Sequence, residues 1–422
     1  MKTAAEALPL KRHVAAVVVG NALEFYDFLT YSFFAVYIGQ AYFPSHDPTT
    51  SLLASLATFG AGFVTRPLGG IIIGTLGDRV GRKPAMFLSF TLMGMGMLGV
   101  VFTPSYATIG AAAPVLVVGF RLIQGFALGG EVGPTTAFLI EAPPAGMRGL
   151  YGALQSASQY AAAFAAGCVG TGLSAVLGPA ALARWGWRAA FFLGALIIPF
   201  GLIVRRSLPE TAGAPKAGDE PHVLRAHARL AVLAVLLMAG ATIATYVIFY
   251  LSTYAEVTLH IAPAWSFGAT LTIGLCGTLF APLGGRLSDR FGRKPVMLTS
   301  TCVMIIITIP AFLLLNAVPA GPVLIALAAI LTVVFAMGVG VSIMTISEAL
   351  PARIRSGAMA TLYAVSIAIF GGSAQFNVAW LAARLHAPMA PAYYLTVALV
   401  VALIAILLFP ETAPVCTVAP RE

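Results

Sequence analysis

A charged, glycine-rich segment that occurs twice places the strongest constraint on how this chain folds. The first copy is Gly74-Thr-Leu-Gly-Asp-Arg-Val-Gly-Arg-Lys-Pro84, and the second, 211 positions later, is Gly285-Arg-Leu-Ser-Asp-Arg-Phe-Gly-Arg-Lys-Pro295. This offset is half of the 422-residue chain. Two other segments repeat in the same order: Glu141–Arg148 matches Glu348–Arg355, and Leu208–Thr211 matches Phe409–Thr412. A repeat at the midpoint predicts that a bundle of elements was duplicated.

The composition excludes a water-soluble fold. Hydrophobic residues make up 59% of the chain and charged residues 9%, whereas a soluble domain carries about 25% charged residues. The net charge of +9 does not indicate nucleic-acid binding, because the basic residues lie between apolar runs. The four cysteines show no CxxC spacing, so we expect neither a metal nor another cofactor. The first apolar run contains Glu24 and Asp27, which predicts a membrane span rather than a cleaved signal peptide.

Apolar runs long enough to cross a bilayer, about 20 residues each, occur six times in each half. They lie near 14–38, 52–77, 84–102, 111–139, 149–177, 187–204, 229–254, 264–287, 295–316, 322–349, 356–385 and 391–409. The predicted fold is therefore an all-α membrane protein with twelve transmembrane helices in two six-helix bundles. We expect the first bundle at 1–204, a polar cytoplasmic linker at 205–228 and the second bundle at 229–422.

The placement of lysine and arginine predicts the orientation. Of the 24 basic residues, 19 fall on the side that holds both termini, the linker and both glycine-rich loops. Arg184, Arg188 and Arg384 fall on the opposite side, and Arg66 and Arg121 fall inside spans. Because loops rich in Lys and Arg stay in the cytoplasm, both termini are predicted to be cytoplasmic.

Five ionisable residues lie deep inside predicted spans, all in the first half: Glu24, Asp27, Arg66, Arg121 and Glu131. Such residues are costly in a membrane and usually face a cavity or a partner. Ion pairing that merely neutralises a buried charge is the alternative for any single residue. Five charges together favour a functional pocket, because an apolar core would be cheaper.

Helical spacing assembles polar stripes around these charges. At 3.6 residues per turn, three groups each share a helix face: Arg121, Gln124 and Glu131; Asn21, Glu24 and Tyr31; Gln155, Ser158 and Gln159. The three stripes predict one polar pocket. Aromatic residues of the seventh span could close its other side, although such stripes are more often packing; they are Tyr246, Phe249, Tyr250 and Tyr254.

The repeated loops lie at the predicted membrane surface, where charge costs little. Gly81 and Gly292 permit a tight turn, and each aspartate can pair with a basic residue or with a helix N-terminus. Positive-inside anchoring is the simpler interpretation. The alternative is a latch that holds one conformation, formed by six residues: Asp78, Arg79, Arg82, Asp289, Arg290 and Arg293.

Asp78-Arg-Val-Gly-Arg-Lys83 and its copy resemble the cytoplasmic loop motif of the major facilitator superfamily. Three segments resemble its metabolite:proton symporter family: Asn21-Ala-Leu-Glu-Phe-Tyr-Asp-Phe28, Arg66-Pro-Leu-Gly-Gly70 and Arg121-Leu-Ile-Gln-Gly-Phe-Ala-Leu-Gly-Gly-Glu131. Tyr106–Pro114 and Gln155–Gln159 look most similar to the citrate and tricarballylate branch. The resemblance implies two bundles around a central cavity, in the inner membrane of a bacterium, that alternate access to its two sides.

On this basis we expect a symporter that imports a small organic carboxylate, such as citrate, together with protons. Arginine binds carboxylates as a planar fork, so Arg66 and Arg121 are assigned to the substrate. Neutral contacts are assigned to Asn21, Tyr31, Gln124, Gln155 and Gln159, and proton coupling to Glu24, Asp27 or Glu131. The protein is expected to work as a monomer.

Three alternatives stay open. A carrier of a zwitterion or a neutral-ring acid, such as proline, betaine or shikimate, would keep the fold and the coupling. A channel would suit a polar pore, but acid and base on one bundle favour an occluded site, and counterflow of labelled substrate would separate the two. An intramembrane enzyme would need a nucleophile and base within the spans, whereas all six histidines lie near loops or span ends.

Overall fold

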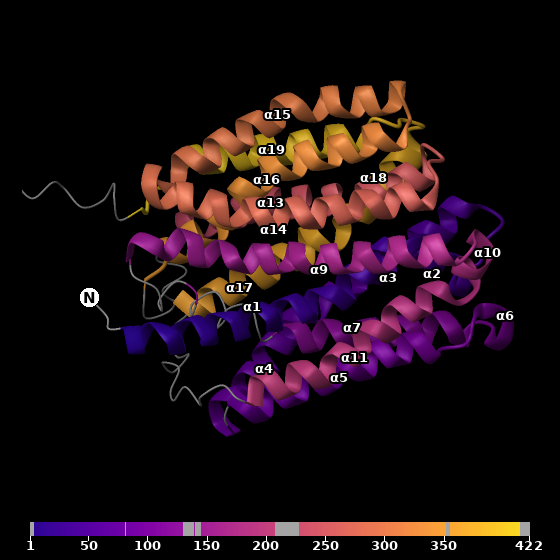
Figure 1. Cartoon of the computed structure of the whole chain (residues 1–422), viewed down its shortest axis with the longest axis horizontal. Coiled ribbons are helices and arrows are strands. Elements are labelled where there is room, and N and C mark those ends of the chain that lie inside the picture. Colours follow the sequence, from indigo (N-terminus) through magenta and orange to yellow (C-terminus); the bar gives the residue numbers. More distant parts are fainter. Residues whose placement is uncertain are drawn as a thin grey trace, which may run out of the picture.

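The computed structural model describes residues 4–80, 82–129, 139, 145–206, 228–351 and 355–413. Within these ranges the regular structure is helical and contains no strand, which confirms the all-α prediction. The helices run roughly along the long axis of the molecule (Figure 1).

Helices of the first half are α1 (Ala4–Phe33), α2 (Ala35–Tyr42), α3 (Pro48–Val64), α4 (Arg66–Val80), α5 (Arg82–Phe102), α6 (Tyr106–Ile109), α7 (Ala112–Leu128), α9 (Arg148–Val176), α10 (Pro179–Ala181) and α11 (Trp187–Arg206). Helices of the second half are α13 (Ala228–Val257), α14 (Pro263–Phe291), α15 (Arg293–Ala317), α16 (Gly321–Ala349), α17 (Arg355–Ser366), α18 (Gly372–Arg384) and α19 (Ala390–Leu408). A π-helical turn, Ile367–Gly371, joins α17 to α18.

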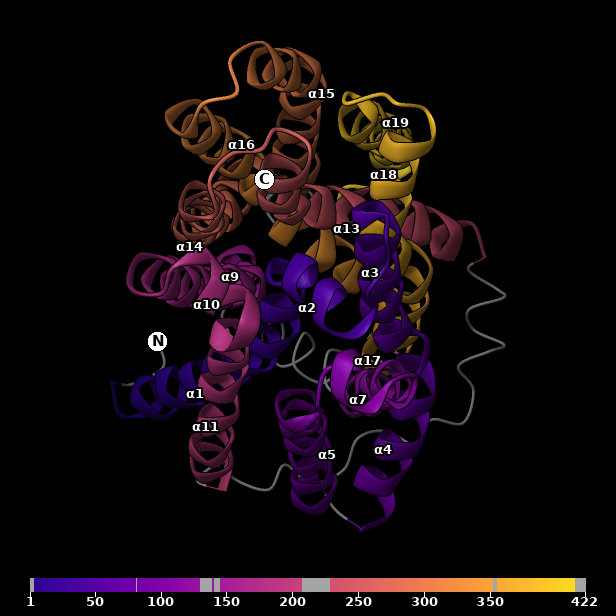
Figure 2. The same cartoon turned by 90° about the vertical axis from the view of Figure 1, so that its right-hand side faces the viewer.

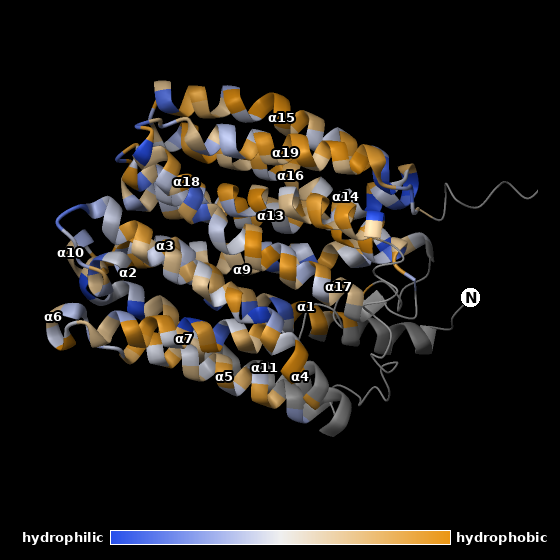
Figure 3. Ribbon diagram, turned by 180° about the vertical axis from the view of Figure 1, so that it is seen from behind, coloured by the Kyte–Doolittle hydropathy of each residue, from blue (hydrophilic) through white to orange (hydrophobic). Residues whose placement is uncertain are grey.

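Seven helical stretches of the described chain are long and apolar enough to cross a membrane: Pro48–Ile73, Ala228–Val257, Pro263–Phe291, Arg293–Ala317, Gly321–Ala349, Ala358–Arg384 and Ala390–Leu408. Two shorter apolar helices are Phe87–Phe102 and Ala112–Leu128. The outer faces carry exposed apolar side chains; Val115 is 71% exposed and Ile306 70%. Figure 3 shows apolar colour along the flanks and polar colour gathered at the two ends, as expected for a bilayer-spanning bundle.

Two predicted spans are interrupted. The second breaks at Thr65, where α3 ends and α4 begins, because Pro67 lacks the N–H that a continuous helix would need. The first is interrupted at Phe34, between α1 and α2. α3 itself starts behind Asp47, whose carboxylate accepts hydrogen bonds from the N–H groups of Thr49 and Thr50, both at 3.0 Å.

The two halves meet along several helices. α9 packs along α14, and α3 packs against α18. Seen end-on, α17 lies beside α4 of the first half (Figure 2). The turn between α14 and α15 lies at one end of the bundle, and Gly292 adopts φ 101° there, a conformation that favours glycine. Gly81 lies outside the described residues.

Candidate functional site

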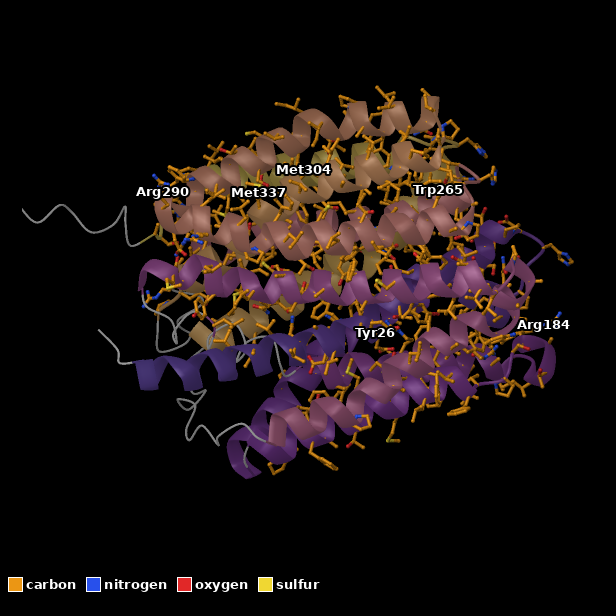
Figure 4. The ribbon with its side chains drawn as sticks, viewed as in Figure 1. Tyr26, Arg184, Trp265, Arg290, Met304 and Met337 are labelled. Atoms are coloured by element: carbon orange, nitrogen blue, oxygen red, sulfur yellow. The ribbon has the colours of Figure 1, made fainter. Side chains whose placement is uncertain are left out.

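Three ionisable side chains meet inside the first half. Asp27 of α1, Arg66 of α4 and Arg121 of α7 are no more than 4% exposed. Figure 4 places Tyr26, the neighbour of Asp27, between the end of the bundle that holds Arg290 and the end that holds Arg184. The charges therefore lie at depth, where each needs a partner or a function.

The pair between Asp27 and Arg121 is loose. Arg121 Nη1 lies 4.0 Å from Asp27 Oδ2, and the same nitrogen donates a 2.7 Å hydrogen bond to Gln124 Oε1. Neither carboxylate oxygen of Asp27 accepts a hydrogen bond from the described residues. A buried carboxylate held this weakly is poorly stabilised in its charged form.

Aromatic rings cover the faces of both guanidinium groups. Arg66 Cζ lies 4.2 Å from the ring centre of Phe63 and 4.7 Å from that of Phe28. Arg121 Cζ lies 4.4 Å from the ring centre of Tyr31, and the Phe28 and Phe59 rings lie farther away, at 5.3 and 5.7 Å. These contacts are attractive because the face of an aromatic ring is electron-rich.

Tyr246 of α13 completes this arrangement from the second half. Its ring centre lies 6.2, 5.9 and 5.6 Å from those of Phe28, Phe59 and Phe63. We call these five rings, Phe28, Tyr31, Phe59, Phe63 and Tyr246, the aromatic cage. Phe59 and Phe63 were not predicted, although they lie four residues apart on one face of α3 that leads to Arg66.

One nitrogen of each guanidinium group, Nε in both Arg66 and Arg121, has no hydrogen-bond partner among the described residues. A cavity lies beside Arg66, lined also by Glu24, Phe25, Phe28 and Leu128. It leaves about 10 Å³ for the centre of a water-sized sphere, enough for roughly one water. Among the described residues, the space beside Arg66 is therefore too small for an organic anion, which enters only after the helices move.

Two residues predicted as neutral substrate contacts, Asn21 of α1 and Gln159 of α9, lie near α9 and α17 respectively. Asn21 Nδ2 donates to the Gln155 carbonyl oxygen at 3.2 Å and to Ser158 Oγ at 2.7 Å, which ties α1 to α9. Gln159 lies near the Tyr363 hydroxyl of α17, but its Nε2 makes no hydrogen bond to a described residue. Asn21 is thus engaged in a contact between helices, whereas the Gln159 amide nitrogen has no described partner.

Of the predicted aromatic residues of α13, Tyr246 lies at the cage and Tyr254 does not. The Tyr254 hydroxyl donates to Asn316 Oδ1 and to the Pro388 carbonyl oxygen, so it packs within the second half. Phe249 lies between them, in contact with Phe33 and Tyr160 of the first half. Tyr254 therefore follows the packing alternative, because its hydroxyl has both of its partners in the second half.

The second glycine-rich loop joins the two halves. Asp289 accepts hydrogen bonds from the first N–H groups of α9, those of Gly149 at 2.7 Å and Leu150 at 2.9 Å. Arg293 Nη1 lies 2.8 Å from Asp289 Oδ1. Arg290 is exposed, with Cζ 5.2 Å from the Phe291 ring centre. Asp289 therefore pairs with both a basic side chain and a helix N-terminus.

Two glutamates extend this network, and the prediction of the site did not include them. Arg293 donates from Nε and Nη2 to the carboxylate of Glu348, both at 3.2 Å. Glu411 accepts from the backbone N–H groups of Arg293 at 3.0 Å and Lys294 at 2.9 Å, at the start of α15. Burial alone would raise the pKa of Glu411, but its backbone hydrogen bonds hold the pKa below the ordinary value. The repeated segments of the sequence include both Glu348 and Glu411 and could have indicated them as residues of this network.

Several predicted site residues lie outside the described part of the structure. Glu131 is among the residues that are not described, and the side chains of Asp78, Arg79 and Arg82 are not described either. Among the described residues, no cluster of three or more His, Cys, Asp or Glu side chains could hold a metal ion.

Comparison with known proteins gives consistent matches. The family model of the Major Facilitator Superfamily matches residues 17–371. The citrate-proton symporter of Klebsiella pneumoniae is 35% identical over 368 residues, which cover 85% of this chain and 82% of that protein. The proline/betaine transporter of Escherichia coli (strain K12) is 33% identical over 424 residues, 96% of this chain and 84% of that protein.

Two further likenesses bear on substrate and fold. The alpha-ketoglutarate permease of Escherichia coli (strain K12) is 33% identical over 378 residues, 87% of this chain and 87% of that protein. The solved structure of the proton:xylose symporter XylE, bound to 6-bromo-6-deoxy-D-glucose, superposes with a TM-score of 0.77 and covers 96% of each chain. At 19% identity that likeness concerns the fold alone.

Proposed function

Because this chain belongs to the major facilitator superfamily, we propose that it is a proton-coupled symporter that imports a small organic carboxylate by alternating access. The observation that carries the proposal is a pair of buried arginines, each with an Nε that makes no hydrogen bond to a described residue, beside the buried Asp27 carboxylate, which accepts none. Citrate or a related tricarboxylate or dicarboxylate is the substrate class, in line with the relatives that carry citrate and alpha-ketoglutarate.

The substrate carboxylates bind the edges of Arg66 and Arg121. The aromatic cage holds both guanidinium planes, so the fork that matches a carboxylate is already oriented. Gln124 fixes one edge of Arg121 through its 2.7 Å hydrogen bond. Such preorganisation lowers the entropy cost of binding.

Proton coupling follows from exchange of partners. Asp27 is charged only while Arg121 is its counterion, at 4.0 Å. When a substrate carboxylate takes that arginine, Asp27 is left buried without a cation, and it takes up a proton. Glu24, which lines the cavity beside Arg66, is the second candidate for the same role, and Glu131 remains a third.

The Lys and Arg distribution supports an orientation with both termini in the cytoplasm of a bacterial inner membrane. The end with Arg290 is then cytoplasmic and the end with Arg184 faces outward. The proposed division of the chain is a first bundle at 1–204, a linker at 205–228 and a second bundle at 229–422. Asp289 and the start of α9 form the inner latch.

A zwitterion carrier is the second candidate, because the proline/betaine transporter matches nearly the whole chain. A quaternary ammonium group would need open aromatic faces, and the guanidinium groups of Arg66 and Arg121 occupy those of the cage. The cage therefore favours an anion.

The test is uptake of labelled citrate, tricarballylate, 2-oxoglutarate, shikimate and proline into proteoliposomes, with and without an inward proton gradient. We expect gradient-driven accumulation of a di- or tricarboxylate. Accumulation of proline alone would show that the substrate is a zwitterion and not an anion. Uptake that is the same with and without the proton gradient would contradict proton coupling.

A further inference from the structure

A buried polar contact joins the two halves next to the aromatic cage. Ser32 Oγ of α1 donates to Gln375 Oε1 of α18 at 2.9 Å, and Gln375 Nε2 lies 2.7 Å from the same hydroxyl. Gln375 Nε2 also donates to the Tyr246 carbonyl oxygen at 3.3 Å. Both side chains are 1% exposed.

Three members of the cage lie close to this contact. Ser32 follows Phe28 by one helical turn, and Tyr246 is itself a member of the cage. Gly372, one turn before Gln375, packs against Gly60 and the Phe63 ring. Because α1 runs toward the end of the bundle that holds Arg184 (Figures 1 and 4), Ser32 and Gln375 form the wall of the cage on that side.

Gln375 carries an amide, whereas the other buried polar side chains described near it in the second half are hydroxyls. The buried polar side chains described in the second half are hydroxyls, apart from Arg293 and Gln375, and Arg293 lies at the start of α15. Gln375 is therefore the amide that the second half brings to the cage. Its two N–H groups can donate to carboxylate or hydroxyl oxygens, which complements the cationic edges supplied by the first half.

We propose that Gln375 is the residue through which the second half contacts the substrate. This rests on the proposed function, since the halves must separate at the outer end to admit a substrate. Separation breaks the bond between Ser32 and Gln375 and leaves the amide free to donate into the opened cavity. A substrate oxygen held by Arg66 and Arg121 accepts from Gln375, and closure returns the amide to Ser32.

Two variants distinguish substrate contact from a simple tie between halves. Gln375→Met keeps the side-chain volume and removes the amide, and Ser32→Ala removes the partner but keeps the amide. We expect Gln375→Met to raise the dissociation constant about tenfold or more, the loss of a hydrogen bond to a charged group. Ser32→Ala should bind as tightly as the parent, or more tightly. If both variants weaken binding equally, Gln375 is only a tie and the proposal fails.

The measurement is displacement of labelled citrate in counterflow by the purified full-length protein in proteoliposomes. Gln375→Asn, which keeps an amide on a shorter side chain, should bind with intermediate affinity and serves if Gln375→Met does not fold. Unchanged affinity in both Gln375 variants would overturn the inference while the parent still transports. A parent that carries none of the five test substrates would instead overturn the proposed function, and this inference with it.

Discussion

The environment of Asp27 decides what this residue can do. A carboxylate in a dry interior is kept charged by hydrogen bonds or by a close cation. The oxygens of Asp27 accept no hydrogen bond from the described residues. Its cation, Arg121, lies at 4.0 Å, which is too far for a strong ion pair. The charge state of Asp27 is therefore set by one partner, which the substrate can remove.

We expect Asp27→Asn to abolish accumulation driven by a proton gradient, because the amide has the size of the carboxyl group but cannot titrate. Substrate exchange should continue at a rate on the order of the parent's, since Arg66 and Arg121 are kept. The measurement is uptake and counterflow in the same proteoliposomes. Glu256→Gln is the control: Glu256 is a carboxylate beside Tyr37, away from the cage, and its loss should leave accumulation intact. Accumulation by Asp27→Asn would rule out this residue as the proton carrier.

At the scale of elements, helix ends connect parts of the chain that are distant in sequence. Asp289 caps the N-terminus of α9, and Glu411 caps the N-terminus of α15. Each supplies acceptors to backbone N–H groups that have no partner within their own helix, and negative charge where the helix dipole is positive.

Asp289→Asn should weaken the contact between the halves at the Arg290 end by about 1 kcal/mol, because the amide keeps one acceptor oxygen of two and loses the negative charge. That corresponds to roughly fivefold more of the form open at that end. The readout is the labelling rate of Ala153→Cys, a fully buried α9 position beside Gly285, in a cysteine-free background. Arg290→Gln, at an exposed neighbour, is the control and should label like the parent. Equal rates in Asp289→Asn and the control would contradict the latch.

Glu411→Gln should lower the midpoint of thermal unfolding at pH 7 through loss of about 1 kcal/mol, because the amide keeps one acceptor oxygen of two and carries no charge. The pKa of Glu411 in the folded protein lies below its ordinary value of 4.5. Its stabilisation is therefore fully present above pH 4.5 and disappears as the pH falls through the lowered pKa. The difference between variant and parent should shrink over that range. A difference that stays constant down to pH 3 would show that charge is not the cause.

At the scale of the whole molecule, the halves approach closely because glycines lie where they meet. Gly60 of α3 faces the Gly372 carbonyl oxygen of α18, at a distance that leaves no room for a Cβ atom. Inside the first half, the cavity beside Arg66 leaves room for about one water. The described conformation is thus closed, and the tightness of packing between the halves controls how readily it forms.

We expect Gly60→Ala to slow initial uptake on the order of tenfold, because the added methyl group prevents full closure, and overpacking costs about 1–3 kcal/mol. Gly119→Ala is the matched control: a methyl group there meets nothing within 4 Å. Uptake by both variants is measured in proteoliposomes with equal amounts of protein. A Gly60→Ala rate equal to that of Gly119→Ala would mean that the contact does not limit the transport cycle.

The sequence alone determined the class of fold and the residues that bear charge inside it. A bilayer requires runs of apolar residues, so the spans could be recognised without a structure, and the superfamily prediction is confirmed. Helical spacing also predicted one pocket that includes Tyr31 and Arg121, with Asp27 at its border, because positions three or four apart share a helix face. The break at Thr65 was missed, although Pro67 was there to indicate it.

Only the tertiary structure decided which partner each group has. Ser32 and Gln375 are separated by 343 positions, and Asp289 reaches Gly149 across 140. Periodicity tells which face of a helix is polar, but the rotation and depth of one helix against another depend on the packing of every side chain between them. For that reason the rings of Phe59 and Phe63, the cap of Glu411 and the engagement of Asn21 with α9 were beyond the sequence.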